Sequence, residues 1–178
     1  MMFYQGITKA DVVNGNGVRV VLWVSGCSLH CKNCHNPETW DKEAGQPFDE
    51  RAKAELFEAL DKPYIEGITF SGGHPLEEYN LRDIVSLMKE IKKRSPEKNI
   101  WLYTGFTWEM LMEDIKANTD LSELYKVVMS LCDVIIDGPY KDDLRDITLA
   151  WRGSTNQRVI DVQKSLEEGK IIIWNASK

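Results

Sequence analysis

The stretch Ser25-Gly-Cys-Ser-Leu-His-Cys-Lys-Asn-Cys-His-Asn-Pro37 holds three of the four cysteines of the chain. Cys27, Cys31 and Cys34 follow one another so closely that their thiolates can converge on one inorganic centre. The glycine, asparagine and proline residues around them favour a loop over a regular helix. The sequence therefore predicts a metal or iron–sulfur site on a loop.

The number of cysteines bears on which centre this loop holds. Structural zinc takes four protein ligands in a closed tetrahedron, and His30 or His35 could complete a Cys3His site. A 4Fe-4S cluster is normally held by four thiolates, so three would leave one iron open to an outside ligand. The fourth cysteine, Cys132, lies far downstream in an apolar run and is expected to be a small core residue. Both a cluster and a zinc site remain open on this spacing.

Length and composition limit the class of protein. The chain has 178 residues, and 22 Lys and Arg against 28 Asp and Glu give a net charge of -6. We expect a single domain over residues 1–178, and the acidic balance argues against a nucleic-acid partner. The strongest apolar run, residues 20–24, is too short to cross a membrane, and the first residues lack a signal-peptide pattern. We therefore expect a cytoplasmic protein with no membrane partner.

Strand and helix patterns alternate along the chain. Strands are expected at residues 3–8, 18–24, 67–70, 99–103 and 133–136, the first two joined as a hairpin through an Asn-Gly turn. Helices are expected at residues 49–60, 81–94, 108–115 and 121–131. Asp49, Asn80 and Thr107 are the predicted N-caps. Residues 159–168 are predicted as a strand followed by a helix, and residues 171–174 as a last strand.

This alternation predicts an α/β fold with a parallel sheet and crossover helices. A complete eightfold barrel needs about 250 residues, so we expect an open, partial (β/α) barrel. Ligand sites in such folds form at the C-terminal ends of the strands. Four expected strand ends carry unusual residues, and we predict that all four face one cavity: the cysteine stretch, Ser71-Gly-Gly-His-Pro75, Thr104-Gly105 and Asp137-Gly-Pro139.

Several residues at these ends are candidates for ligand binding, each with a simpler alternative. Gly72 and Gly73 either allow a ligand to approach the backbone or form an ordinary turn. Asp137 and Thr104 either contact a ligand through their polar groups or belong to turns. Arg152 either binds a carboxylate bidentately or lies on the surface.

The cysteine stretch and the residues after it resemble those of a known enzyme family. Cys27-Ser-Leu-His-Cys31-Lys-Asn-Cys34 resembles the cluster motif of the radical S-adenosylmethionine enzymes, and His35-Asn-Pro-Glu-Thr-Trp-Asp41 resembles the glycyl-radical-enzyme activases among them. The resemblance implies a 4Fe-4S cluster on the three cysteines, with S-adenosylmethionine chelating the open iron through its amino and carboxylate groups. It further implies that flavodoxin or a similar reductant supplies an electron, and that cleavage gives methionine and a 5′-deoxyadenosyl radical. No catalytic residue is expected beyond the cluster ligands.

The resemblance also assigns residues to the cofactor. Gly72, Gly73 and His74 match the family's Gly-Gly-Glu-Pro motif, which receives the amino group of the methionine moiety, with histidine here in place of the acidic residue. Asn33 stands where many members have an aromatic residue near the adenine, so only backbone contacts from Asn33, Cys34 and His35 are expected there.

Further segments narrow the resemblance to the activases of anaerobic ribonucleoside-triphosphate reductase. These segments are residues 11–19, 36–41, 103–108, 137–140 and 151–158. The resemblance implies that reductase as the protein partner, with a glycine that loses an alpha hydrogen to the radical. The alternatives are an activase of another glycyl radical enzyme such as pyruvate formate-lyase, a small iron–sulfur electron carrier and a structural zinc protein.

Overall fold

The computed structural model describes residues 1–176, and one sheet contains all the strands found within them. The strands are β1 (Phe3–Asp11), β2 (Arg19–Val24), β3 (Gln46–Pro47), β4 (Gly67–Gly72), β5 (Asn99–Tyr103), β6 (Val134–Asp137) and β7 (Arg158–Asp161). The α-helices are α1 (Glu50–Leu60), α2 (Glu78–Arg94), α3 (Trp108–Lys116), α4 (Asp120–Leu131) and α5 (Val162–Glu168). Two short 3-10 helices, η1 (Pro37–Thr39) and η2 (Asp142–Leu144), lie in the loops.

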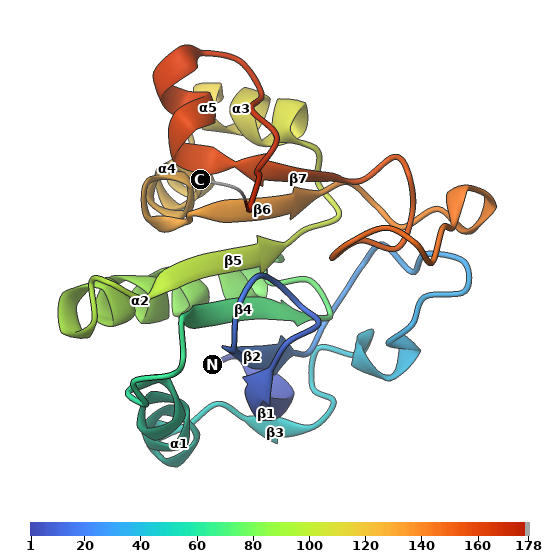
Figure 1. The fold of residues 1–178 in the computed structure, drawn as a ribbon. Helices are drawn as coiled ribbons and strands as arrows, with labels where there is room; N and C mark the ends of the chain where they lie inside the picture. The colour runs from blue at the N-terminus through green and yellow to red at the C-terminus, as the bar shows by residue number, and fades with distance from the viewer. Residues whose placement is uncertain (177–178) are drawn as a thin grey trace.

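The strand order is β3-β1-β2-β4-β5-β6-β7. The central strands β2, β4, β5 and β6 are parallel neighbours, which confirms the predicted α/β fold with crossover helices. Strands β1, β3 and β7 pair antiparallel at the two sides. Figure 1 shows the arrowheads of β4, β5 and β6 pointing to the same end of the molecule, where the long loops lie.

The predicted hairpin of the first two strands is confirmed, since β1 pairs antiparallel with β2. The connection between them is longer than a two-residue turn, because the strands end at Asp11 and begin again at Arg19. Gly15 and Gly17 within it adopt positive φ angles of 143° and 73°, a region that glycine enters without a steric penalty.

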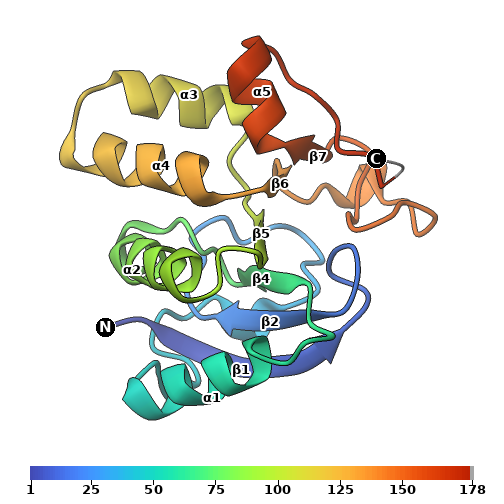
Figure 2. The same cartoon turned by 60° about the vertical axis from the view of Figure 1, so that its left-hand side comes forward.

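The two faces of the sheet carry different side chains. Ile100 and Leu102 belong to the main core with the apolar residues of the helices, and α2 and α4 lie side by side on this face (Figure 2). Trp101 belongs to a second buried cluster with Val134, Ile136 and Val159. Alternation along β5 therefore separates a helix-covered face from an aromatic face, and the second face contributes to the site.

The predicted helices are present, and two of the three predicted caps are confirmed. Asp49 accepts a hydrogen bond from the Ala52 amide, and Thr107 caps α3. Asn80 is not a cap: α2 begins at Glu78, and the buried Asn80 side chain donates instead to the Ser25 carbonyl oxygen at 2.8 Å. The amide ties α2 to the end of β2.

The C-terminal part agrees with the prediction only in its first half. β7 followed by α5 confirms the expected strand and helix over residues 159–168. Residues 171–174 do not form the expected strand, since this segment makes only an isolated bridge from Ile173 to Ile160. The segment still lies along β7, since the Trp174 amide donates to the Val159 carbonyl oxygen at 2.9 Å, and the Trp174 ring packs edge-on against Trp101 and Trp151. The short strand β3 was not expected.

Two further expectations concern burial. Cys132 is fully buried in the main core, which confirms the interpretation as a core residue. Burial raises the pKa of its thiol. Over residues 1–176, none of the helices combines the length and the apolar character that crossing a membrane requires.

Candidate functional site

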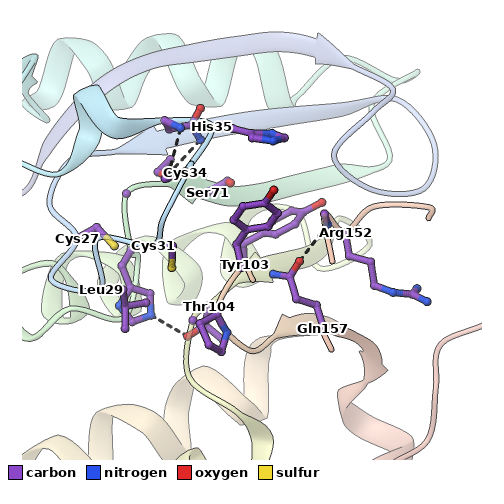
Figure 3. A pocket seen from close by; sticks show the side chains of 18 of the residues that line it. Cys27, Leu29, Cys31, Cys34, His35, Ser71, Tyr103, Thr104, Arg152 and Gln157 are labelled. Carbon is purple, nitrogen blue, oxygen red and sulfur yellow. Dashed lines mark hydrogen bonds between the residues drawn. The ribbon is translucent and has the colours of Figure 1, made fainter. Parts of the chain in front are cut away.

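A cavity of about 420 Å³ lies at the C-terminal ends of the parallel strands (Figure 3). All four predicted strand ends contribute to its lining: the cysteine stretch, Ser71 to His74 after β4, Thr104 and Gly105 after β5, and Gly138 to Tyr140 after β6. These segments are far apart in the sequence, and the parallel topology brings them together.

Hydrogen bonds hold the cysteine loop, defined as residues 25–36, against η1 and its neighbours. The Gly26 amide donates to the Thr39 carbonyl oxygen at 2.6 Å, and the Cys27 amide donates to the Trp40 carbonyl oxygen at 3.1 Å. His30 and Asn33 have positive φ angles of 44° and 56°. These two residues turn the chain between the cysteines, as the composition of the loop predicted.

The three cysteines of this loop are free, half-buried and line the same cavity. Burial raises the pKa of the Cys27 thiol, although the amides of Leu29 and His30 act in the opposite direction. Burial also raises the pKa of Cys31, with a further contribution from Cys34. Because a metal centre binds thiolates, filling the site would release protons from these thiols.

The three thiols suit a cluster, and the two histidines that could complete a zinc site lie against aromatic rings. Among residues 1–176, no three His, Cys, Asp or Glu side chains are placed to hold a single ion. His30 stacks on Trp40 at 4.5 Å between ring centroids, and His35 lies against Tyr140 at 5.5 Å. A four-iron cluster spaces its thiolates more widely than a single ion does, so three free thiols around one cavity suit a cluster.

The glycines at the end of β4 leave no room for a side chain beside β2 and the cysteine loop. Gly72 has a φ of 103°, and a Cβ at this residue would lie 2.6 Å from the Val24 carbonyl oxygen. A Cβ at Gly73 would lie 2.5 Å from the Gly26 carbonyl oxygen. Both glycines therefore allow a close approach of backbone, from the end of β2 at Gly72 and from the cysteine loop at Gly73. Both glycines also line the cavity, so their predicted backbone contacts to a ligand stay a prediction.

His74 and Thr104 both line the cavity and contact each other. The Nε2 atom of His74 lies 2.8 Å from the Thr104 hydroxyl oxygen, and its Nδ1 atom lies 3.3 Å from a carboxylate oxygen of Glu77. His74 is only 1% exposed, and its ring packs edge-on against Phe106. Both ring nitrogens thus have protein partners before any ligand is present.

Asn33 and His35 differ in their positions. His35 lines the cavity, as predicted for a residue near a ligand. Asn33 is exposed and is not among the lining residues, and its side-chain amide donates to Asp142 at 2.8 Å. Its side chain therefore links the cysteine loop to η2, and its predicted backbone contact to a ligand stays a prediction.

The carboxylate of Asp137 is buried and has protein partners. Its carboxylate is 1% exposed, accepts from the Trp108 amide at 2.8 Å and pairs with Arg158. It does not line the cavity, whereas Gly138 and Pro139 do. The ion pair with Asp137, joined by one with Glu109, raises the pKa of Arg158. The carboxylate therefore joins β6 to β7, and its predicted contact to a ligand stays a prediction.

Arg152 lines the cavity from the long loop between β6 and β7, and its Nε atom is buried without a hydrogen-bond partner in the described part of the chain. Figure 3 shows Arg152 on the opposite side of the view from Cys27 and Cys31. Sequence reasoning missed Gln157, whose side chain accepts from the Gly153 amide at 3.0 Å. A polar side chain in a loop without periodicity gave no signal of this role.

Tyr103 and Trp151 were also missed as lining residues. The Tyr103 hydroxyl donates to the Trp151 carbonyl oxygen at 2.6 Å, and Trp151 has a positive φ of 59°. Burial raises the pKa of Tyr103. Alternation along β5 places Tyr103 on the same face as Trp101, so the strand pattern held a signal for it.

Comparison with known proteins agrees with this site. The family described as a 4Fe-4S single cluster domain matches residues 13–160. An anaerobic ribonucleoside-triphosphate reductase-activating protein from Enterobacteria phage T4 is 45% identical over 158 residues, which cover 89% of this chain and 93% of the relative. A protein of the same name from Pasteurella multocida is 38% identical, and the match covers 88% of this chain and 95% of the relative. One from Escherichia coli K12 is 37% identical, and the match covers 89% of this chain and 97% of the relative. The chain therefore belongs to the family of the anaerobic ribonucleoside-triphosphate reductase-activating proteins and carries a 4Fe-4S single cluster domain.

Proposed function

We propose that this protein activates anaerobic ribonucleoside-triphosphate reductase by generating a glycyl radical on it. The relatives are named as activating proteins of that reductase. The observation that carries the proposal is the shared cavity, because the three free thiols of Cys27, Cys31 and Cys34 lie there beside the glycine turn after β4. A cluster and a small-molecule cofactor would share this space.

The three cysteines would hold a 4Fe-4S cluster with one iron open to S-adenosylmethionine. Held there and reduced by an external electron donor, the cluster would supply one electron for cleavage of S-adenosylmethionine to methionine and a 5′-deoxyadenosyl radical, which would take an alpha hydrogen from a glycine of the reductase. The difficult chemistry belongs to the cofactor, and the protein binds, orients and excludes water.

The residues of the cavity have separate roles in this proposal. The volume of about 420 Å³ falls in the range of roughly 300–1,000 Å³ for small-molecule sites. Arg152, with its unpartnered buried Nε, suits a carboxylate. The backbone at Gly72 and Gly73 would contact the amino group, and the backbone from Asn33 to His35 would contact the adenine. His74 and Thr104 would position the first of these segments.

The remaining parts of the proposal concern the fold and the partners. We infer that the sheet is a partial (β/α) barrel of the radical S-adenosylmethionine type and that residues 1–178 form one domain. A protein loop carrying the target glycine would enter from the open side. Flavodoxin or a similar reductant would supply the electron, in the cytoplasm.

The experiment is an anaerobic activation assay with two candidate partners. The reconstituted protein, a reductant and S-adenosylmethionine are mixed with the reductase or with pyruvate formate-lyase, and electron paramagnetic resonance is recorded. A glycyl doublet only on the reductase is the expected result. A doublet only on the lyase would assign the protein to the other activase. Uncleaved S-adenosylmethionine would favour an electron carrier, and tight zinc without iron uptake would favour a structural zinc protein.

A further inference from the structure

Glu77 occupies the N-cap position of α2 but does not cap it. Its side chain makes no hydrogen bond to the first turn of the helix. Instead, its Oε1 atom accepts from the Ser28 amide at 2.8 Å and from the Ser28 hydroxyl at 2.6 Å. Ser28 follows Cys27 directly in the cysteine loop. A carboxylate at the start of one helix therefore holds a different loop, next to a predicted cluster ligand.

The same carboxylate oxygen is held from the other side by His74. The His74 Nδ1 atom lies 3.3 Å from Glu77 Oε1, and a carboxylate can only accept, so Nδ1 carries the proton in this contact. His74 Nε2 lies 2.8 Å from the Thr104 hydroxyl oxygen. The same oxygen accepts a hydrogen bond from the Phe106 amide at 3.0 Å. One chain of contacts thus joins the cysteine loop, the turn after β4 and the end of β5.

Burial and charge strengthen the His74 end of this chain of contacts, whereas the Ser28 end is exposed. The side chains of His74 and Glu77 are 2% and 12% exposed, and hydrogen bonds that involve an ionised partner are stronger than neutral ones. The hydrogen bond from His74, followed by those from Ser28, lowers the pKa of Glu77 to about 2. Among residues 1–176, His74 is the one basic side chain within ion-pair distance of Glu77. Glu77 is therefore an anion beside the cysteine loop.

We propose that Glu77 is a positioning residue for the cysteine loop. Held by His74, its carboxylate fixes Ser28 and with it the backbone of Cys27, and it places a negative charge next to the thiolates. The fixing of the loop is a property of the protein alone, whereas the effect of the charge on a cluster rests on the proposed function. Because reduction potentials of iron–sulfur centres depend on nearby charge and hydrogen bonds, the charge favours the oxidised state.

The first test uses the protein without any cluster. Amide hydrogen exchange of residues 26–34 is compared between wild type, Glu77→Gln and Glu78→Gln. Glu78 is the next residue along α2, is exposed and makes no hydrogen bond or ion pair to the cysteine loop within residues 1–176, so Glu78→Gln is the matched control. We expect the loop amides of Glu77→Gln to exchange at least about tenfold faster, as the loss of a charge-assisted hydrogen bond implies. Unchanged exchange in Glu77→Gln would overturn the proposal.

The second test uses the reconstituted protein and measures the midpoint potential of the cluster. Glu77→Gln removes the charge while keeping the shape, and we expect a positive shift that Glu78→Gln lacks. Ser28→Ala removes the Ser28 hydroxyl as a donor to Glu77 and keeps the Glu77 charge, so its shift in midpoint potential is expected to be smaller. A potential equal to wild type in Glu77→Gln would overturn the electrostatic part. Failure of wild type to cleave S-adenosylmethionine would refute the proposed function instead, and the exchange result would still stand.

Discussion

The two sides of the cavity are built in different ways. On the side of the cysteine loop, backbone meets backbone: the Gly73 and His74 amides donate to the carbonyl oxygens of Val24 and Gly26 at 2.8 and 2.7 Å. On the side of the long loop between β6 and β7, side chains such as Gln157 hold the backbone.

Unpartnered polar atoms sharpen this contrast. In the described part of the chain, the long loop contains two buried polar atoms without partners, Arg152 Nε and Asn156 Oδ1, while the Nε1 atom of Trp40 is a third, next to the cysteine loop. Leaving buried polar groups unpaired costs free energy unless a ligand meets them. Of these three atoms, only Arg152 Nε belongs to a residue that lines the cavity, so the Arg152 side keeps an unpaired polar group for a ligand.

The largest expected effect is on the cysteine side. Replacing Cys27, Cys31 or Cys34 by alanine removes one of the three thiolates, and we expect loss of the cluster and of S-adenosylmethionine cleavage. Iron and sulfide analysis after anaerobic reconstitution measures it, with about four of each per chain expected for wild type. Cys132→Ala is the control, because this buried cysteine lies in the core. Cleavage retained in all three variants would refute the assignment.

The next effect tests how tightly the cysteine side is packed. Gly73→Ala would place a Cβ 2.5 Å from the Gly26 carbonyl oxygen, and overpacking of this kind costs roughly 1–3 kcal/mol. We expect a lower free energy of unfolding in urea and a lower iron content. Gly6→Ala is the matched control, since nothing lies within 4 Å of a Cβ at Gly6. Equal losses in both variants would show that the contact between the loops is unimportant.

The contrast between the two sides also explains what could be predicted from the sequence. The cysteine loop is one short stretch with closely spaced thiols, and paired glycines mark the end of β4, so these members of the site were identifiable. The strand ends met as expected because parallel topology fixes their positions. The ion pair of Asp137 was not predicted because its partner Arg158 comes from an antiparallel strand, and the pairing of β7 could not be deduced from local patterns.

The same reasoning applies to Asn80 and Glu77. Both are polar residues at the start of a helix, where capping is the usual role. Each instead bonds to the loop after β2, through Ser25 or Ser28. Such long-range hydrogen bonds leave no periodic signal in the sequence, so only the structure could reveal them.

A smaller effect is expected on the Arg152 side. Arg152→Lys keeps the charge but removes the bidentate geometry that suits a carboxylate. We expect S-adenosylmethionine to bind about tenfold more weakly, as the loss of one good charged hydrogen bond implies. Anaerobic calorimetry on the reconstituted protein measures the Kd. Arg82→Lys, an exposed residue of α2, is the control, and an unchanged Kd in Arg152→Lys would show that Arg152 does not contact the cofactor.

The smallest effect concerns Arg158, which begins β7 at the end of the long loop that carries Arg152. Arg158 pairs with both Asp137 and Glu109, and its hydrogen bonds lower the pKa of Glu109 to about 2 from 4.5. A lowered carboxyl pKa adds stability that is present above about pH 4.5 and is lost as the pH falls through about 2. The Glu109 side chain is 62% exposed, so solvent screening keeps the contribution below about 1 kcal/mol.

Urea unfolding should therefore show wild type slightly more stable than Glu109→Gln at pH 7, with the difference shrinking towards pH 3 and in high salt. The exposed Glu113→Gln on the same helix is the control, and a difference for Glu109→Gln that stays constant with pH would show that the ion pair does not stabilise this side.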